Sequence, residues 1–529
     1  MTLTSDVNKP AWKRSDHAYA TLKIIYVNFH LNLLLTMDIR EEELPLTPVR
    51  KEILLDDVLS TLKFGKFHFK MLILTCGAYF SACAEMMLIV FLSKPIKSEW
   101  NLDDMIFPLL PFCCGIISLI SSFTFGSVSD KFGRQRPLLA ALISVAVFGI
   151  SSAFAPYFWT FVILRAFVSF GTSGIETVDF VLLLEFLPKK NRGCTMVVIT
   201  LCGAFGALCS AGLAWVILPR FGWRWFVGAC AVPSCIVLAY RLWFKFESPR
   251  YLYISGQRHR GLEVLKEIAK QNNTNLPEGD IVCPPSPERG RVQDLFSKKL
   301  RGRTVFSMLV WFFQSMGFWG VTMYLPEYLG SIDIDPYFNM FAVYIGEIPG
   351  LCLTMVFIEH RKLGRVRCLR LFSFSTAIGL LLFAFINVPI AKTVFVVLVY
   401  FFMVPIYSIL NTYTPELYPT DSRSIAIASM YMVIAFPGII TAFIGASVLS
   451  TNITWLYPTV AAGFFSLQFL FTFGLTSETA GRSLNDTKQT TQADMISQAA
   501  VTTPVVQNGS IGNGDVGNNC DVTDASPML

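Results

Sequence analysis

Charged residues are scarce in this sequence. Of its 529 residues, 15% are Asp, Glu, Lys or Arg and 53% are hydrophobic, whereas the charged share of a soluble globular domain is about 25%. This composition excludes an ordinary soluble protein and indicates a chain that crosses a membrane several times. The net charge of +6 is gathered in particular loops and not on one surface, so we expect no nucleic-acid partner.

Sequence patterns for catalysis or cofactor binding are also missing. The chain has no GxxxxGK[ST] phosphate-binding loop, its five histidines are scattered, and no metal-ligand cluster or nucleophile arrangement is present. We therefore expect a protein that is not an enzyme, holds no cofactor or metal and is not driven by ATP. The 13 cysteines lie mostly in apolar runs, which predicts buried thiols and no disulfide framework.

Long apolar runs dominate what is present. A spanning helix needs about 20 apolar residues, and about twelve runs of that length fall near 71–92, 105–127, 137–155, 158–184, 194–218, 225–244, 304–325, 337–358, 370–389, 392–415, 425–449 and 453–475. Lipid leaves no water to satisfy backbone groups, so these runs must be helices. The sequence predicts an all-α integral membrane fold with a cytosolic N-terminal region at 1–69, six-helix bundles at 70–244 and 304–475, a cytosolic central loop at 245–303 and a disordered cytosolic tail at 476–529.

Lys and Arg predict the orientation of these helices. They are concentrated in the loops after the second, fourth, sixth, eighth and tenth runs, whereas the alternate loops are poorer in bases or acidic. Short cytosolic loops carry such an excess, so both termini are expected in the cytosol. The membrane that holds the protein is expected to be either the plasma membrane or that of an intracellular vesicle. The acidic segment that starts at Met37 is typical of a natural amino terminus, so we expect the preceding residues to be an optional extension.

Three charged loops repeat at one offset. Aligning Asp130 with Arg361 gives 361 − 130 = 231, and the other two pairs give 416 − 185 = 231 and 478 − 247 = 231. The paired segments are GSVSDKFGRQR with RKLGRVR, EFLPKKNRG with ELYPTDSRS, and ESPR with ETAGR. A period this long indicates two fused half-proteins and not a solenoid.

These motifs resemble those of the major facilitator superfamily. The GxxxDKxGR loop, the ExLPxxxRG loop, GWRW at 222–225 and ESPRYL at 247–252 are most similar to the branch of sugar porters and organic ion transporters. The AEMM stretch at 84–87 is most similar to the synaptic vesicle glycoprotein 2-related proteins, including their SVOP-like members. The resemblance covers about residues 60–482 and implies two pseudo-symmetric six-helix bundles with a substrate bound near the bilayer midplane.

The resemblance also implies a cytosolic gate in the charged loops. In the family, the residue matching Asp130 caps a helix of the other half, and Arg134 pairs with an acid near the end of helix four, for which Glu185 is the candidate. The second copy has Arg361 in place of Asp130, so the sequence does not predict a symmetric lock, and the alternative is that these bases only anchor the topology. The gate set is Gly126, Asp130, Lys131, Gly133, Arg134, Arg136, Glu185, Arg192, Glu247, Arg250, Arg361, Gly364, Arg365, Glu416, Arg423, Glu478 and Arg482.

Ionisable residues inside the spans are the next candidates, because burying one in lipid costs at least about 2.5–3.5 kcal/mol. They are Glu85, Arg165, Glu176, Asp179 and Glu347. Helical spacing places Arg165, Glu176 and Asp179 on one face of helix four, and the resemblance matches Arg165 to an arginine linked to coupling or gating. We expect the four acids to face a central cavity and Arg165 to hold a helix-four carboxylate or a substrate anion. The alternative is that these groups are buried ion pairs that fix helix packing.

Five further polar or aromatic residues could line that cavity, namely Gln314, Trp319, Tyr324, Asn411 and Tyr413. The sequence therefore favours a monomeric secondary active or facilitative transporter of a small organic ion or metabolite, surrounded by membrane lipid and open to proton coupling. It does not decide the sign of the substrate charge. The alternative is a non-transporting binding or trafficking protein of the vesicle-glycoprotein type, favoured by the irregular second gate and by Ala82, where related proteins often have Asp.

Overall fold

The computed structural model describes residues 52–187, 192–283, 292–298, 300–331, 335–358, 363–418, 420–451, 453–475 and 478–479, and the side chains of 192–194, 331 and 420–424 are not described. The predictions for Arg192, Arg361, Arg423 and Arg482 therefore lie outside the described side chains.

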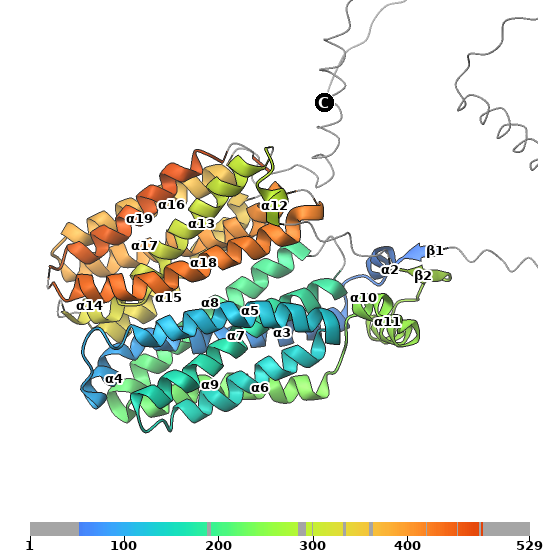
Figure 1. Cartoon of the computed structure of the whole chain (residues 1–529), viewed down its shortest axis with the longest axis horizontal. Helices are drawn as coiled ribbons and strands as arrows, with labels where there is room; N and C mark the ends of the chain where they lie inside the picture. Colours follow the sequence, from blue (N-terminus) through green and yellow to red (C-terminus); the bar gives the residue numbers. More distant parts are fainter. Residues whose placement is uncertain are drawn as a thin grey trace, which may run out of the picture. The chain divides into compact units, whose positions relative to one another are not determined.

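Long helices form two bundles of six (Figure 1). The first bundle consists of α3 (Lys66–Met87), α5 (Leu109–Phe132), α6 (Gln135–Ser152), α7 (Phe158–Phe186), α8 (Arg192–Phe221) and α9 (Trp223–Trp243). The second consists of α13 (Arg301–Thr322), α15 (Pro336–Ile358), α16 (Gly364–Phe385), α17 (Pro389–Leu417), α18 (Thr420–Leu449) and α19 (Leu456–Thr472). Among the described residues, eleven of these helices are long and apolar enough to cross a membrane, and α19 is a shorter apolar helix. The predicted all-α membrane fold is confirmed.

Shorter elements connect the long helices. They are α2 (Leu55–Thr61), the 3-10 turn η1 (Leu88–Phe91), α4 (Ser93–Trp100), α10 (Pro249–Ile254), α11 (Arg258–Asn272), α12 (Val292–Leu295) and α14 (Leu325–Ser331). The amphipathic stretch of the central loop forms α11, which buries Leu265 and Ile268. Strands β1 (Glu52–Leu54) and β2 (Asp280–Val282) pair in a small two-stranded sheet.

Glycines allow the close helix contacts that a membrane bundle needs. A Cβ on Gly206 of α8 would overlap the carbonyl of Phe80 on α3, and one on Gly350 of α15 would overlap the carbonyl of Phe401 on α17. Between the two bundles, α5 packs against α18 and α8 packs against α15. The bundles therefore meet along two helix pairs that the internal repeat relates to each other.

Candidate functional site

The predicted gate loop of the first bundle forms a network of charges. The Arg134 guanidinium donates to Asp130 (Nη1 to Oδ1, 2.7 Å) and to Glu185 at the end of α7 (Nη2 to Oε1, 3.3 Å). The contact predicted between Arg134 and Glu185 is therefore present. We call Asp130, Arg134, Glu185 and Glu247 the first charge cluster.

Glu247 joins this cluster by binding the start of α6. Its carboxylate accepts the backbone N–H groups of Arg134 (2.8 Å) and Gln135 (3.3 Å). A carboxylate at a helix N-terminus satisfies unpaired amides and interacts well with the helix dipole. Gly133 precedes Arg134 and has backbone angles of φ 91° and ψ 171°. A Cβ on this residue would lie 2.8 Å from Glu247 Cδ. Only glycine combines this backbone conformation with room for the carboxylate.

The second bundle repeats the same contacts. Arg365 donates to Glu416 (Nη2 to Oε1, 2.8 Å), and Glu478 accepts the backbone N–H groups of Arg365 (2.7 Å) and Val366 (3.0 Å). Gly364 has φ 64°. Arg365, Glu416 and Glu478, the second charge cluster, each lie 231 residues after their counterparts, since 365 − 134 = 231, 416 − 185 = 231 and 478 − 247 = 231. The two halves thus share these contacts despite the difference at Asp130 and Arg361.

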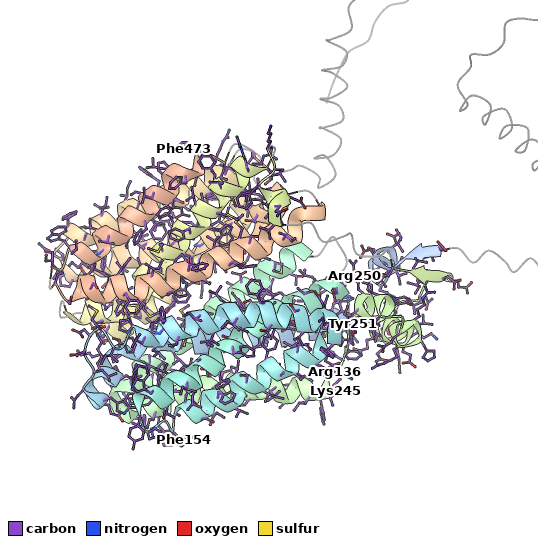
Figure 2. All side chains as sticks on the ribbon, in the orientation of Figure 1. Arg136, Phe154, Lys245, Arg250, Tyr251 and Phe473 are labelled. Atoms are coloured by element: carbon purple, nitrogen blue, oxygen red, sulfur yellow. The ribbon has the colours of Figure 1, made fainter. Side chains whose placement is uncertain are left out.

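Other members of the predicted gate set lie around the first cluster. Arg250 pairs with Asp56 of α2 (2.6 Å), and the Lys131 carbonyl accepts the Tyr251 hydroxyl (2.9 Å). Arg136 is exposed and lies with Arg250 and Lys245 at one end of the first bundle (Figure 2). A Cβ on Gly126 would make only an ordinary contact with Thr177.

Two ion pairs are buried inside the first bundle. Arg165 of α7 donates to the Glu85 carboxylate of α3 (2.6 Å) and also to the Glu85 carbonyl, and the two side chains are 1% and 0% exposed. Asp179 of α7 accepts from Arg241 of α9 and from the Thr75 hydroxyl (3.2 Å). Arg165 is therefore paired with Glu85 and with neither of the two partners expected from the sequence, a helix-four carboxylate or a substrate anion. The spacing of residues along a helix predicts which face of that helix a side chain occupies. It does not predict which neighbouring helix supplies the partner, so Glu85 could not be identified as the partner from the sequence.

Glu176 and Glu347 differ from these pairs. Glu176 lies on α7 of the first bundle and Glu347 on α15 of the second, and no hydrogen bond or ion pair joins either carboxylate to any part of the chain that the structure describes. Glu347 is nonetheless only 6% exposed. Both carboxylates interact electrostatically with the Cys83 thiol of α3. Each half thus carries one carboxylate that interacts electrostatically with the Cys83 thiol.

Five tyrosines interact electrostatically with the two carboxylates. Tyr79, Tyr407 and Tyr431 interact electrostatically with Glu176, and Tyr344 and Tyr400 interact with Glu347. We call these five tyrosines, Cys83, Asn411 and the two glutamates the central cluster.

The central cluster contains an accessible face. The Tyr431 hydroxyl donates to Asn411 Oδ1 (3.0 Å). Tyr431 is 44% exposed, and Tyr79, Cys83 and Tyr407 are half-buried. A small molecule can therefore contact side chains of this cluster.

Sequence reasoning found Glu176, Glu347 and Asn411 but missed the rest of the central cluster. Tyr79 with Cys83, and Tyr407 with Asn411, are polar pairs at i and i+4 within apolar runs. Such spacing places two side chains on the same face of a helix. This spacing is the signal that could have identified them.

The other predicted cavity residues pack within the second bundle. Gln314 donates to the Met403 carbonyl (3.2 Å) and the Tyr324 hydroxyl to the Ala442 carbonyl (2.7 Å), and both side chains are buried. Tyr413 is also buried, and Trp319 is half-buried.

A further ion pair joins the two bundles at the end that carries α4 and α14, away from α10 and α12 (Figure 1). Glu327 of α14 accepts from Lys97 (2.8 Å) and from Ser93 (2.6 Å), both of α4, and Lys97 also contacts Asp104 (3.0 Å). Burial opposes the charged form of Lys97, but the hydrogen bonds and charges of the two acids outweigh it and raise the Lys97 pKa. Neither Lys97 nor Glu327 was among the residues that the sequence singled out.

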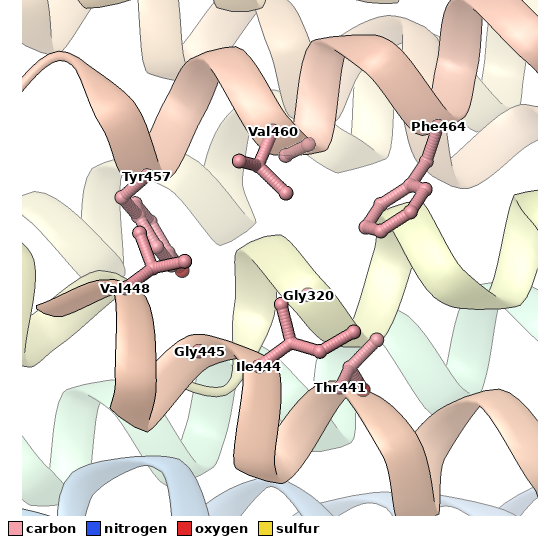
Figure 3. A pocket seen from close by; sticks show the side chains of 9 residues that line it. Gly320, Thr441, Ile444, Gly445, Val448, Tyr457, Val460 and Phe464 are labelled. Atoms are coloured by element: carbon pink, nitrogen blue, oxygen red, sulfur yellow. The ribbon is translucent and has the colours of Figure 1, made fainter.

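A pocket between α13, α18 and α19 is a different kind of site (Figure 3). No charged residue lines it. Its two hydroxyl groups donate to backbone carbonyls, Thr441 to Pro437 and Tyr457 to Val321. This pocket therefore offers an ion no partner, and the central cluster is the better candidate site.

Comparison with known proteins places this architecture among transporters. The model of the Major Facilitator Superfamily matches residues 74–442. The Synaptic vesicle 2-related protein of Xenopus laevis is 29% identical over 464 residues, which cover 83% of each chain. The Organic cation/carnitine transporter 7 of Arabidopsis thaliana is 27% identical over 486 residues, which cover 82% of this chain and 95% of the relative. The resemblance to synaptic vesicle 2-related proteins found in the sequence is confirmed.

Solved structures share the fold. The inward-open xylose transporter XylE of E. coli superposes with a TM-score of 0.64 at 16% identity, over 79% of this chain and 98% of that one. At this identity the likeness concerns the arrangement of the helices and not the ligand.

Proposed function

Because this chain belongs to the Major Facilitator Superfamily, we propose that it moves a small organic ion or related metabolite across a membrane by alternating access, as a secondary active or facilitative transporter. The observation that carries this proposal is the pair of equivalent charge clusters. The contacts of the first cluster tie α6, α7 and the segment after α9 together, and those of the second tie the corresponding parts of the other half. Each half can therefore move as one body relative to the other.

The remaining features of the proposal follow from the same arrangement. The charge clusters would lie at the cytosolic end, together with both termini, because Lys and Arg are enriched in these loops. The Arabidopsis relative is named an organic cation/carnitine transporter, and a solved neighbour is described as a proton:xylose symporter. These names support a small-molecule substrate and a test for proton coupling. The Xenopus relative's name favours a vesicle membrane, and we propose a monomer.

The test of transport uses the purified full-length protein in proteoliposomes. We expect saturable uptake from one pool among radiolabelled organic cations, organic anions and sugars, with internal pH recorded at the same time. Arg134→Ala should lower uptake at least tenfold, because it removes two charge-assisted contacts of the first cluster. If folded protein gives no uptake from any pool, the transport proposal fails.

The alternative function is a binding or trafficking protein without flux. Its sequence support came from Ala82 and from the irregular second gate. Arg365, Glu416 and Glu478 nevertheless make the same contacts as the equivalent residues of the first charge cluster, so the second loop is less irregular than its sequence. These observations favour the transporter.

Alternating access requires the ends of the bundles to separate in turn, and the Lys97–Glu327 pair would hold one end closed. Lys97→Gln should weaken this contact by about 1 kcal/mol. That loss raises the open population about fivefold. Hydrogen-exchange mass spectrometry should show exchange about fivefold faster in both α4 and α14.

The matched control is Arg224→Gln. Arg224 of α9 pairs with Glu99 of α4 (2.6 Å), so this contact lies within the first bundle. The Arg224→Gln variant should change hydrogen exchange in α4 but leave hydrogen exchange in α14 unaltered. Equal exchange of α14 in the wild type and in Lys97→Gln would rule out the proposed closure.

A further inference from the structure

Each of the two arginines buried in the first bundle has its own carboxylate partner. Arg165 is neutralised by Glu85, and Arg241 is neutralised by Asp179. Both pairs lie within the first bundle and are almost completely buried. Neither arginine is therefore available to an anion without breaking a buried ion pair, which is strongly unfavourable.

The negative charges left over are those of Glu176 and Glu347. An isolated buried carboxylate is unfavourable unless it is protonated or paired, and ionisable groups inside membranes commonly mark a substrate or ion pathway. Glu347 is 6% exposed and has no hydrogen-bonding partner among the described residues. In its charged form it therefore requires a positive group that the described part of the chain does not supply.

We propose that the substrate is a small organic cation, an amine or quaternary ammonium compound, held between Glu176 of the first bundle and Glu347 of the second. This inference rests on the proposed transport function and names the substrate class of its central cluster. The sequence left the sign of the substrate charge open, and the pairing of Arg165 and Arg241 decides it.

The tyrosines of the central cluster suit the same ligand. Tyrosine faces attract cations, and aromatic enclosures are a recurrent way to bind quaternary ammonium groups. Three tyrosines interact electrostatically with Glu176 and two with Glu347. Tyr431 is 44% exposed and can present its ring to a ligand while its hydroxyl is bound to Asn411.

The position of the two carboxylates gives the cation a role in closure. One carboxylate comes from each half, and like charges repel when the halves approach. A bound cation replaces this repulsion by two attractions that span both halves. Neutral sugars would satisfy neither carboxylate, and an organic anion would add a third negative charge.

Binding of radiolabelled probes to the purified full-length protein tests the inference. The probes are tetraethylammonium and 1-methyl-4-phenylpyridinium as cations, benzoate as an anion and glucose as a neutral sugar. We expect binding of at least one cation and neither of the other two. Glu176→Gln and Glu347→Gln should each weaken it at least tenfold, whereas Glu263→Gln, which removes an exposed carboxylate from α11, should not.

Substitutions at Tyr431 distinguish the contribution of its ring to cation binding from that of its hydroxyl group. Tyr431→Phe keeps the ring and should bind within about twofold of the wild type, whereas Tyr431→Leu should bind about fivefold more weakly. Size-exclusion chromatography and circular dichroism show whether each variant is folded.

Specific outcomes overturn the inference. Binding of benzoate or glucose in place of the cations refutes it. It is also refuted if the folded wild-type protein binds neither cation, or if the two glutamine variants bind the cation as tightly as the wild type. Uptake of anions or sugars into proteoliposomes would contradict the cation inference but would still support the transport proposal. Absence of all uptake would remove both.

Discussion

Arg165→Met is expected to lower the free energy of unfolding by about 3–5 kcal/mol, because it leaves the Glu85 carboxylate buried without its cation. The two side chains are 1% and 0% exposed, so water cannot replace the lost partner. Arg165 also donates to the Glu85 carbonyl, and that acceptor loses its donor in the same variant. Thermal unfolding of the purified protein in detergent, at fixed detergent and lipid concentration, measures the effect.

The double variant Glu85→Gln/Arg165→Met is the control that isolates the stranded charge. Removing both charges of a buried pair is often neutral, so the double variant should recover most of the lost stability. Arg224→Met breaks an ion pair whose side chains are 41% and 36% exposed, and it should cost at most about 1 kcal/mol. If the double variant is as unstable as Arg165→Met, the loss comes from packing and not from charge.

The fold could be predicted because its main constraint is local. A run of about 20 apolar residues has one stable conformation in lipid, and the helices of the structure begin and end within a few residues of the predicted runs. The charged loops could be paired because their motifs recur at a fixed offset. Arg134 meets Glu185, the acid that the family resemblance implied, whereas the equivalent contact between Arg365 and Glu416 was not predicted.

The central cluster was harder to predict because it depends on contacts between helices. The spacing along α7 placed Arg165, Glu176 and Asp179 on one face, yet Arg165 pairs with α3 and Asp179 with α9. Glu176 interacts electrostatically with Tyr79 of α3. Aromatic residues make up 14% of the chain, so composition could not distinguish the tyrosines of the cluster from those that face lipid. The Lys97–Glu327 contact joins two short connecting helices, for which no periodic pattern exists.

Gly133→Ala is expected to have the second large effect, because it combines backbone strain with a collision at the first charge cluster. Gly133 has φ 91° and ψ 171°, a region occupied almost exclusively by glycine, and another residue there costs about 1–3 kcal/mol. The added methyl would also displace Glu247 from the two amides at the start of α6. Losing hydrogen bonds to a charged group adds about 1.5–3 kcal/mol.

Gly222 supplies the matched control for the strain alone. Its backbone angles are φ 83° and ψ 175°, close to those of Gly133, but nothing lies within 4 Å of a Cβ built on it. Gly222→Ala should therefore lose only the backbone contribution, and thermal unfolding should show a clearly smaller decrease than for Gly133→Ala. In a Glu247→Ala background the carboxylate is gone and only the Tyr251 ring, 3.1 Å away, remains close, so Gly133→Ala should then cost only slightly more than Gly222→Ala. Equal losses for the two glycine variants in the wild-type background would show that Glu247 does not hold the start of α6. The proposed gate would then lack the rigid first half that alternating access requires.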